Sequence, residues 1–152
     1  MQNSQKIQTM NTTYKQLKLS HAGALQLLNT ALEKALAMNQ PQCIAVVDDG
    51  CNLMAFIRMD GAKVLSEKSS IHKAMTAASS RTPTGNTPAD IETKLALATG
   101  GVMTNLKGGL PIIVGGQVIG GIGVGSGTGD QDREVANFAL AVFAGAQTFK
   151  FD

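Results

Sequence analysis

The first regular pattern of apolar positions runs from His21 to Met38, where leucines recur at three- and four-residue intervals. This spacing is typical of one face of an amphipathic helix. Ser20 precedes the pattern as a candidate N-cap, and Pro41 follows its end. We therefore predict a helix across this stretch.

Two pairs of short, largely β-branched runs follow, and each pair is joined by turn residues. Residues 43–47 and 53–58 are separated by an Asp-Asp-Gly turn, and residues 110–114 and 117–124 by a Gly-Gly pair. Both patterns predict β-hairpins. Glycines inside the last run weaken a strand, so we expect another backbone or a ligand to come close there.

Three further stretches read as helices: residues 62–79, 87–99 and 130–148. The resulting order is helix, hairpin, two helices, hairpin, helix. Adjacent hairpins favour an antiparallel sheet with helices laid against it, an α/β arrangement of the α+β kind. We predict a flexible tail over residues 1–16 and a single domain over residues 17–152. A chain of 152 residues has a length that fits one hydrophobic core.

Composition bears on the surface of the molecule. Only 16% of the residues are charged, whereas ordinary globular domains carry about 25%. This deficit indicates either self-association or a surface rich in Gly, Ala and Thr. The two cysteines, Cys43 and Cys51, are too few for a secreted disulfide scaffold, and we expect free structural thiols.

Charge and hydropathy exclude some classes of partner. The net charge is +2 and the basic residues are scattered, which argues against a nucleic-acid partner. No apolar run approaches the roughly 20 residues that span a bilayer. The N-terminal residues also lack the apolar centre of a signal peptide. We therefore expect a cytoplasmic protein without nucleic-acid or membrane partners.

Six segments in a fixed order carry a family resemblance. They are residues 45–53, 56–62, 72–78, 108–112, 118–124 and 130–132, which read AVVDDGCNL, FIRMDGA, HKAMTAA, GGLPI, VIGGIGV and DQD. Together they resemble the GlcG/HbpS family, which includes the C-terminal domain of PduO-type proteins. The resemblance covers residues from about 17 to 149.

The resemblance implies a profilin-like, three-layer α/β/α fold with a five-stranded antiparallel sheet. It also implies homo-oligomers, built in several members from dimers up to octamers. Some members bind haem. Family membership fixes the fold better than the function, because one fold hosts many unrelated sites.

The sequence departs from the usual family pattern at two places. Residues 124–127 read Val-Gly-Ser-Gly, where the family often has Gly-Val-Ser-Gly, and this change could move a ligand-binding turn. His72 occupies a position that is commonly small in the family, and it adds an imidazole there.

Haem iron needs an axial donor such as His. The candidates are His72 and His21, the only two histidines. No CXXCH motif is present, so any haem would be held without covalent attachment. His72 could instead pack or act in acid–base catalysis. His21 could be a plain surface residue, although some PduO-type relatives have a haem-ligating His near the first helix.

Arg58, Asp60 and Lys73 form a second group of candidates, since an Arg fork and a Lys charge can hold a carboxylate or a haem propionate. The alternative is a structural ion pair, either Arg58 with Asp60 or Lys73 with Asp48. Gly123 and Gly125 are candidate ligand-contact positions.

The glycine-rich residues 125–129 lead into the last predicted helix. Their backbone N–H groups could hold an anion at the helix N-terminus. Asp130 places a carboxylate at the same point, and it could instead serve as the cap of the helix.

Two functions of different classes follow. The favoured one is a homo-oligomeric binding protein for haem or a related tetrapyrrole. The alternative is an enzyme of small-molecule catabolism, with His72 or Lys73 as acid–base group and Arg58 holding a carboxylate substrate. An accessory role in cofactor traffic, without chemistry, is a third. The first two require these side chains to converge on one concave space.

Overall fold

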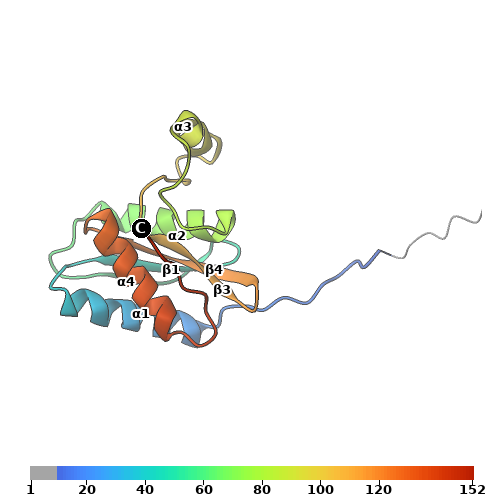
Figure 1. Cartoon of the computed structure of the whole chain (residues 1–152), viewed down its shortest axis with the longest axis horizontal. Helices are drawn as coiled ribbons and strands as arrows, with labels where there is room; N and C mark the ends of the chain where they lie inside the picture. The colour runs from blue at the N-terminus through green and yellow to red at the C-terminus, as the bar shows by residue number, and fades with distance from the viewer. Residues whose placement is uncertain (1–9) are drawn as a thin grey trace, which may run out of the picture.

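The computed structural model describes residues 10–152 and has an α+β fold, with four helices and a four-stranded antiparallel sheet in that range. Its elements follow the predicted order (Figure 1). They are α1 (His21–Ala37), β1 (Cys43–Asp48), β2 (Leu53–Arg58), α2 (Ser66–Ser80), α3 (Ala89–Ala98), β3 (Gly109–Val114), β4 (Gln117–Gly125) and α4 (Gly129–Val142).

Local sequence signals explain most of the element ends. The Ser20 hydroxyl accepts a hydrogen bond from the Gly23 N–H at 3.0 Å, so the predicted N-cap of α1 is confirmed. The last helix is shorter than predicted, because Phe143 adopts an extended backbone (ψ 120°) and Gly145 has a φ of +79°. Of the predicted tail, residues 1–9 lie outside the described residues. Residues 10–16 are exposed and contain no helix or strand.

The strands lie in the order β2-β1-β4-β3, and every neighbouring pair is antiparallel. The expected fifth strand is not present among residues 10–152. At the outer edge of β3, the chain after α4 makes one isolated bridge between Val114 and Ala146. The Gln147 N–H also donates to the Ile113 carbonyl at 2.9 Å. The segment therefore touches the edge of the sheet without continuing as a strand.

Helices cover both faces of the sheet: α1 and α4 pack on one face, and α2 packs on the other (Figure 1). Alternate residues of β1 point to opposite faces of the sheet, as the pleat of a strand requires. Ile44 and Val46 belong to the larger core beneath α1 and α4, and Ala45 and Val47 to the smaller one beneath α2. None of the described helices has the length and apolarity to cross a bilayer.

The glycines of β4 allow α2 to lie directly on the strand backbone. A Cβ at Gly123 would come within 2.0 Å of the Ser70 carbonyl oxygen, and one at Gly121 within 2.2 Å of the Ala74 carbonyl oxygen. Contacts this short exclude any side chain. The close approach brings Lys73, on the same helix, to the end of β4.

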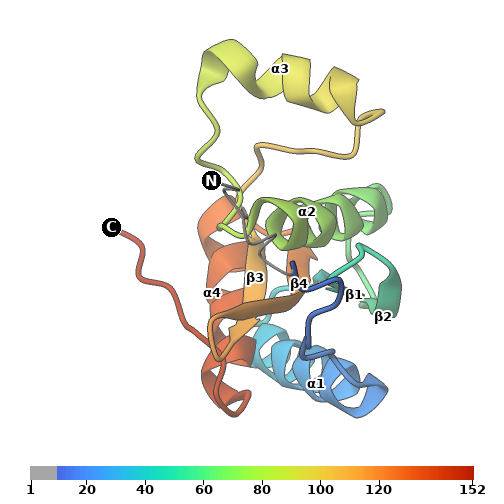
Figure 2. The same cartoon turned by 90° about the vertical axis from the view of Figure 1, so that its right-hand side faces the viewer.

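Residues 81–108, which we call the arm, leave the body between α2 and β3. Helix α3 lies within the arm and stands above α2, away from the sheet (Figure 2). None of its residues is buried.

Two glycines on β4 provide a test of this packing. Gly123→Ala should lower the free energy of unfolding by about 3 kcal/mol or more, because overpacking against a backbone carbonyl forces α2 to move. Gly125→Ala is the matched control and should cost less, since its new Cβ would meet the Ser69 Oγ at 3.2 Å and the Ser66 carbonyl oxygen at 3.3 Å, contacts that a shift of a few tenths of an ångström relieves. Urea unfolding measures both variants, and equal losses would contradict the packing described here.

Candidate functional site

A buried ion pair joins α2 to α4 beside the end of β4. The Lys73 Nζ, whose residue is 4% exposed, donates to the Asp132 Oδ2 at 2.9 Å and to the Val124 carbonyl at 2.8 Å. Asp132 is 2% exposed, and its Oδ1 accepts the Gly127 N–H at 3.0 Å. Gly108 closes over the pair with a φ of +120°, and a Cβ there would lie 3.2 Å from the Lys73 Nζ.

The electrostatics of this pair combine two opposing effects. Burial raises the pKa of the Asp132 carboxyl, while the Lys73 charge and the hydrogen bonds it receives act in the opposite direction. Taking two charges out of water costs free energy, which hydrogen bonds to both partners help to offset. An ammonium group has three donors, and Lys73 directs two of them to the protein. The third makes no hydrogen bond to a described residue.

Lys73 and Asp132 lie on the wall of a pocket of about 410 Å³. Three parts of the chain, far apart in sequence, build it. They are the start of α2, the loop that precedes α4, and the returning leg of the arm, by which we mean residues 99–108 between α3 and β3. The lining residues are Lys63, Ser66, Ser69, Lys73, Asn105, Leu106, Lys107, Ser126, Gly127, Gly129 and Asp132.

Cationic and hydroxyl groups dominate this lining. Lys63 and Lys107 add two ammonium groups to that of Lys73, and Ser66, Ser69 and Ser126 add hydroxyls. The Lys107 Nζ lies 3.6 Å from the Asp130 Oδ1, a loose and exposed pair. Three cations facing one fully paired buried carboxylate suit a ligand with a negatively charged group.

The loop before α4 does not act as a free anion cradle. Its Gly127 N–H is taken by Asp132, and its Thr128 N–H donates to the Gln131 side chain at 2.9 Å. The Thr128 hydroxyl caps α4 by accepting the Gln131 N–H at 3.2 Å, so the expectation that Asp130 is the cap is wrong. Thr128 and Gln131 form a capping box, which satisfies both groups reciprocally.

The structure separates Lys73 from the other two members of its predicted group. Arg58 ends the edge strand β2 and Asp60 follows it; both are exposed, and neither lines the pocket. Neither forms an ion pair within residues 10–152. Lys73 pairs with Asp132 and not with Asp48, whose carboxylate accepts turn N–H groups from Gly50 and Asn52.

The two histidines lie on different elements. His72 is half-buried on α2, directly after Ile71 and before Lys73, but it is not part of the pocket wall. His21 is exposed at the first residue of α1. Within residues 10–152, no three His, Cys, Asp or Glu side chains gather in a way that could hold a metal ion.

The two predicted glycines also differ in their surroundings. Gly123 lies against the α2 backbone, whereas Gly125 lies beside the pocket, where a Cβ would be 3.2 Å from the Ser69 Oγ. Sequence reasoning missed the pairing role of Asp132, because 59 residues separate it from Lys73. It also missed the arm residues of the wall, for which the polar Asn105-Leu106-Lys107 run beside Gly108 is only a weak signal.

Comparison with known proteins identifies related chains. Residues 19–141 match the family described as "Haem degrading protein HbpS-like". Protein GlcG of Escherichia coli K12 is 39% identical over 127 residues, which cover 83% of this chain and 95% of that protein.

Solved structures agree with this match. The crystal structure of Klebsiella pneumoniae protein ORFY has a TM-score of 0.81 and 33% identity, covering 89% of this chain and 97% of that one. The structure described as a PduOC:Heme complex has a TM-score of 0.80 and 26% identity, covering 88% of this chain and 100% of that one.

The buried pair leads to a stability prediction. Asp132→Asn should lower the free energy of unfolding by about 3–5 kcal/mol, because it leaves the Lys73 charge buried without its counterion. Asp130→Asn, two residues earlier and exposed, should cost less than about 1 kcal/mol. Removing both charges in Lys73→Met with Asp132→Leu should cost less than Asp132→Asn alone. Chemical denaturation measures the free energy of unfolding of all three variants. A double variant less stable than Asp132→Asn would refute an ionised pair.

Proposed function

The chain belongs to the HbpS-like family, and on that premise we propose that it binds haem or a related tetrapyrrole, whose acidic groups enter the Lys73 pocket. One observation carries the proposal: a buried ammonium group, with two hydrogen bonds to the protein, lies on the wall of a pocket that two further lysines and three serines line. Haem propionates are carboxylates, the anions that such a lining recognises.

The acidic end of a tetrapyrrole fits the residues of this pocket. Lys73 would supply a fixed charge on its wall, while Lys63 and Lys107 would supply flexible charges from the start of α2 and from the arm. The hydroxyls of Ser66 and Ser69 add hydrogen-bond donors. Leu106, also on the wall and 56% exposed, offers apolar surface to the body of the ligand.

The iron of a bound haem would need a donor from outside this lining, which contains no His, Cys, Met or Tyr. His72 is one residue from Lys73 on α2, and His21 is exposed on α1. When bound, haem supplies redox and oxygen chemistry, and the protein positions it. The PduOC:Heme relative, at 26% identity over 88% of this chain, supports a tetrapyrrole as the ligand.

Titration of the purified protein with hemin tests this proposal. We expect saturable binding with a shifted Soret band, and loss of that shift in either His72→Ala or His21→Ala, whichever removes the iron ligand. A spectrum that does not change on mixing would overturn haem binding. A shift that survives in both variants and in their combination would refute histidine ligation.

A matched ligand isolates the role of the pocket within the same titration. Hemin with both propionates esterified should bind at least about tenfold more weakly, because the loss of even one charge-assisted hydrogen bond costs about 1.5–3 kcal/mol. Lys63→Gln with Lys107→Gln should produce a similar loss for hemin and little further loss for the ester. Lys34→Gln is the control, since Lys34 pairs with Glu134 away from the pocket. Equal affinity for hemin and its ester would mean that the propionates do not bind in the Lys73 pocket.

The same pair favours a second function, acid–base catalysis on a small carboxylic acid. Lys73 and Asp132 provide a proton donor and a carboxylate on the pocket wall, 2.9 Å apart. Lys63 and Lys107 could hold the carboxylate of a substrate, the role that sequence analysis gave to Arg58.

Proton exchange measures this second function across a whole class of candidate substrates. A panel of 2-oxo and 2-hydroxy acids in D₂O should include one whose NMR signal from the exchangeable C–H (C3 of a 2-oxo acid, C2 of a 2-hydroxy acid) decays with the protein, and this decay should stop in Lys73→Met. The Lys34→Gln protein should retain it. If no acid exchanges faster than in buffer alone, catalysis of this kind is refuted.

A further inference from the structure

Arg133, in the second turn of α4, carries a buried charge without a counterion in the part of the chain that the structure describes. The residue is 8% exposed, and none of the four ion pairs of residues 10–152 includes it. A guanidinium group is always charged in proteins and has five N–H donors. One of them reaches the Thr84 carbonyl at a long 3.4 Å, and the buried Nε has no hydrogen-bond partner. A charge removed from water and paired so poorly is costly.

The acidic residues of α4 do not supply the missing carboxylate. Each of them pairs with a lysine from another part of the chain: Asp130 with Lys107 at 3.6 Å, Asp132 with Lys73 at 2.9 Å, and Glu134 with Lys34 at 3.1 Å. Arg133 therefore lies among three acids in the sequence, and its unused N–H groups have no acceptor on its own helix.

The segment that follows α4 covers the guanidinium group. It turns back towards the start of that helix (Figure 2), and Asn137 holds it at Phe149. The Asn137 Nδ2 donates to the Phe149 carbonyl at 2.6 Å, and its Oδ1 accepts the Phe149 N–H at 2.9 Å. Two residues later the Phe151 ring lies over Arg133, with its centroid 4.3 Å from the Cζ. This cation–π contact is favourable, but the ring offers no acceptor to the N–H groups at the edge of the guanidinium plane.

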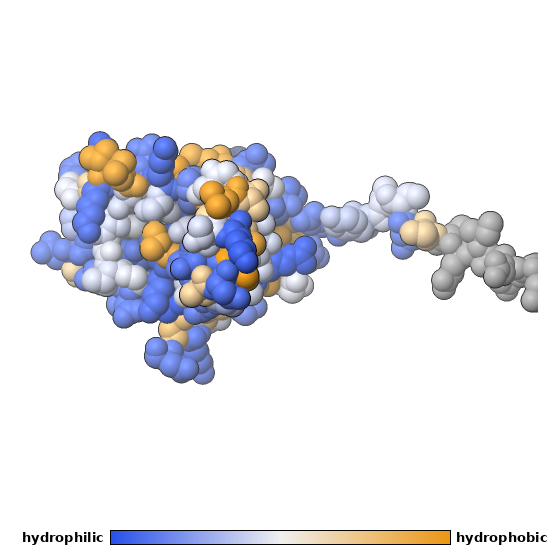
Figure 3. Space-filling model, turned by 90° about the horizontal axis from the view of Figure 1, so that it is seen from above, coloured by the Kyte–Doolittle hydropathy of each residue, from blue (hydrophilic) through white to orange (hydrophobic). Residues whose placement is uncertain are grey.

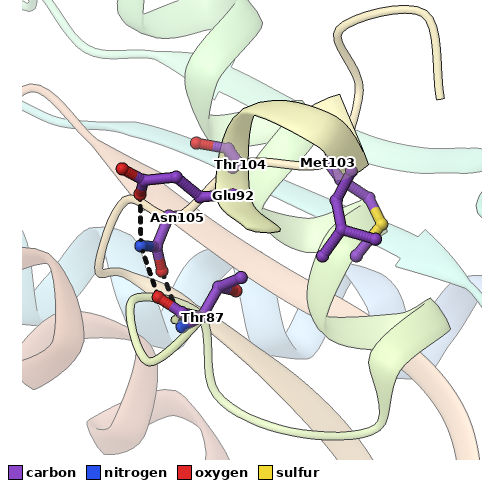
Figure 4. Close-up of a pocket in the computed structure, with 6 residues that line it drawn as sticks. Thr87, Glu92, Met103, Thr104 and Asn105 are labelled. Carbon is purple, nitrogen blue, oxygen red and sulfur yellow. Dashed lines mark hydrogen bonds between the residues drawn. The ribbon is translucent and has the colours of Figure 1, made fainter. Parts of the chain in front are cut away.

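The other side of Arg133 is rigid. Thr84 lies in the outgoing leg of the arm, residues 81–88, and is 4% exposed. Its N–H donates to the Gly109 carbonyl at 2.9 Å, and its Oγ1 accepts the Gly109 N–H at 2.9 Å. Asn105 ties this leg to the rest of the arm through hydrogen bonds to Thr87 and Glu92 (Figure 4). The guanidinium group is thus held from this side at a fixed place.

Residues 150–152 are the part of this arrangement that can move. Within the described chain they make no hydrogen bond or ion pair. Phe151 is held by its contacts with Arg133 and with the edge of the larger core. Figure 3, which looks onto the side of the molecule that carries the arm, shows hydrophilic side chains with apolar ones scattered among them. A charged solute can therefore approach the base of the arm.

We propose that Arg133 binds a small oxyanion, a carboxylate or a phosphate, and that Phe151 closes this site when the anion is absent. The Nε and one Nη of a guanidinium group present two parallel N–H donors, which match two oxygens of either anion. Because Arg133 is largely removed from water, such hydrogen bonds are electrostatically stronger than those of an exposed arginine. The site does not rest on the proposed tetrapyrrole, since Arg133 is not part of the wall of the Lys73 pocket.

Titration of the full chain with inorganic phosphate, followed by ³¹P NMR, tests the site. Phe151→Ala should bind phosphate at least about tenfold more tightly than the unaltered chain, because the anion no longer has to displace the ring. This gain should disappear when Arg133→Met is added. Phe138→Ala is the matched control and should leave the affinity for phosphate unchanged, since that ring lies 5.3 Å from the Lys34 Nζ elsewhere on α4.

A further pair of substitutions separates this site from the Lys73 pocket. The gain in Phe151→Ala should persist when Lys63→Gln and Lys107→Gln are added. A gain that depends on these lysines, one that survives Arg133→Met, or no gain at all would overturn the proposal. Hemin binding by Phe151→Ala should equal that of the unaltered chain, so the two proposals fail independently.

Proteolysis keeps the proposal testable if Phe151→Ala fails to fold. Trypsin cleaves after lysine, so loss of Phe151-Asp152 from the unaltered chain, measured by mass spectrometry, reports release of these residues from Arg133. Phosphate should accelerate this cleavage at least about twofold, because a ligand of the open state raises its population. It should have no effect in Arg133→Met or on cleavage after Lys94, which is exposed on α3. Cleavage after Lys150 that phosphate does not accelerate would overturn closure by Phe151.

Discussion

The buried contact between Lys73 and Asp132 determines how the two sides of this molecule meet. One side chain comes from α2 on one face of the sheet, and the other from α4 on the opposite face. They meet beside Val124, the second-last residue of β4, and Gly108, which directly precedes β3. Because a lone buried charge is costly, each residue requires the other, and the middle of α2 and the first turn of α4 are held at one point.

The glycines of β4 make that contact possible. With no side chains at Gly121 and Gly123, α2 rests on the strand backbone and carries Lys73 down to the Val124 carbonyl. A strand with ordinary residues there would hold the helix a side chain's thickness away. The stability lost through glycine in a strand is therefore offset by the position it gives to a functional group.

The elements of the fold could be predicted because their signals are local. The leucine spacing of α1, the Ser20 cap and the Asp-Asp-Gly turn each act over a few residues. The family resemblance added the overall layering, but it also implied a fifth strand, which is not present among residues 10–152. The site was harder to predict, because Lys73 meets a carboxylate 59 residues away and a wall supplied by the arm. The sequence indicated Lys73, but nothing local linked it to Asp132 or separated it from Arg58.

Asn105 has a place both in the arm and in the pocket. Its side-chain amide makes hydrogen bonds to Thr87 and Glu92 that hold the arm together, and the same residue is part of the pocket wall. A shift of α3 would therefore displace Leu106 and Lys107 relative to Lys73, so a molecule bound to the outer face of α3 would alter the shape of the pocket. Thermodynamic linkage makes such an effect mutual: a molecule on α3 that raises the affinity of the pocket for its ligand is itself bound more tightly, by the same factor, when the ligand is present.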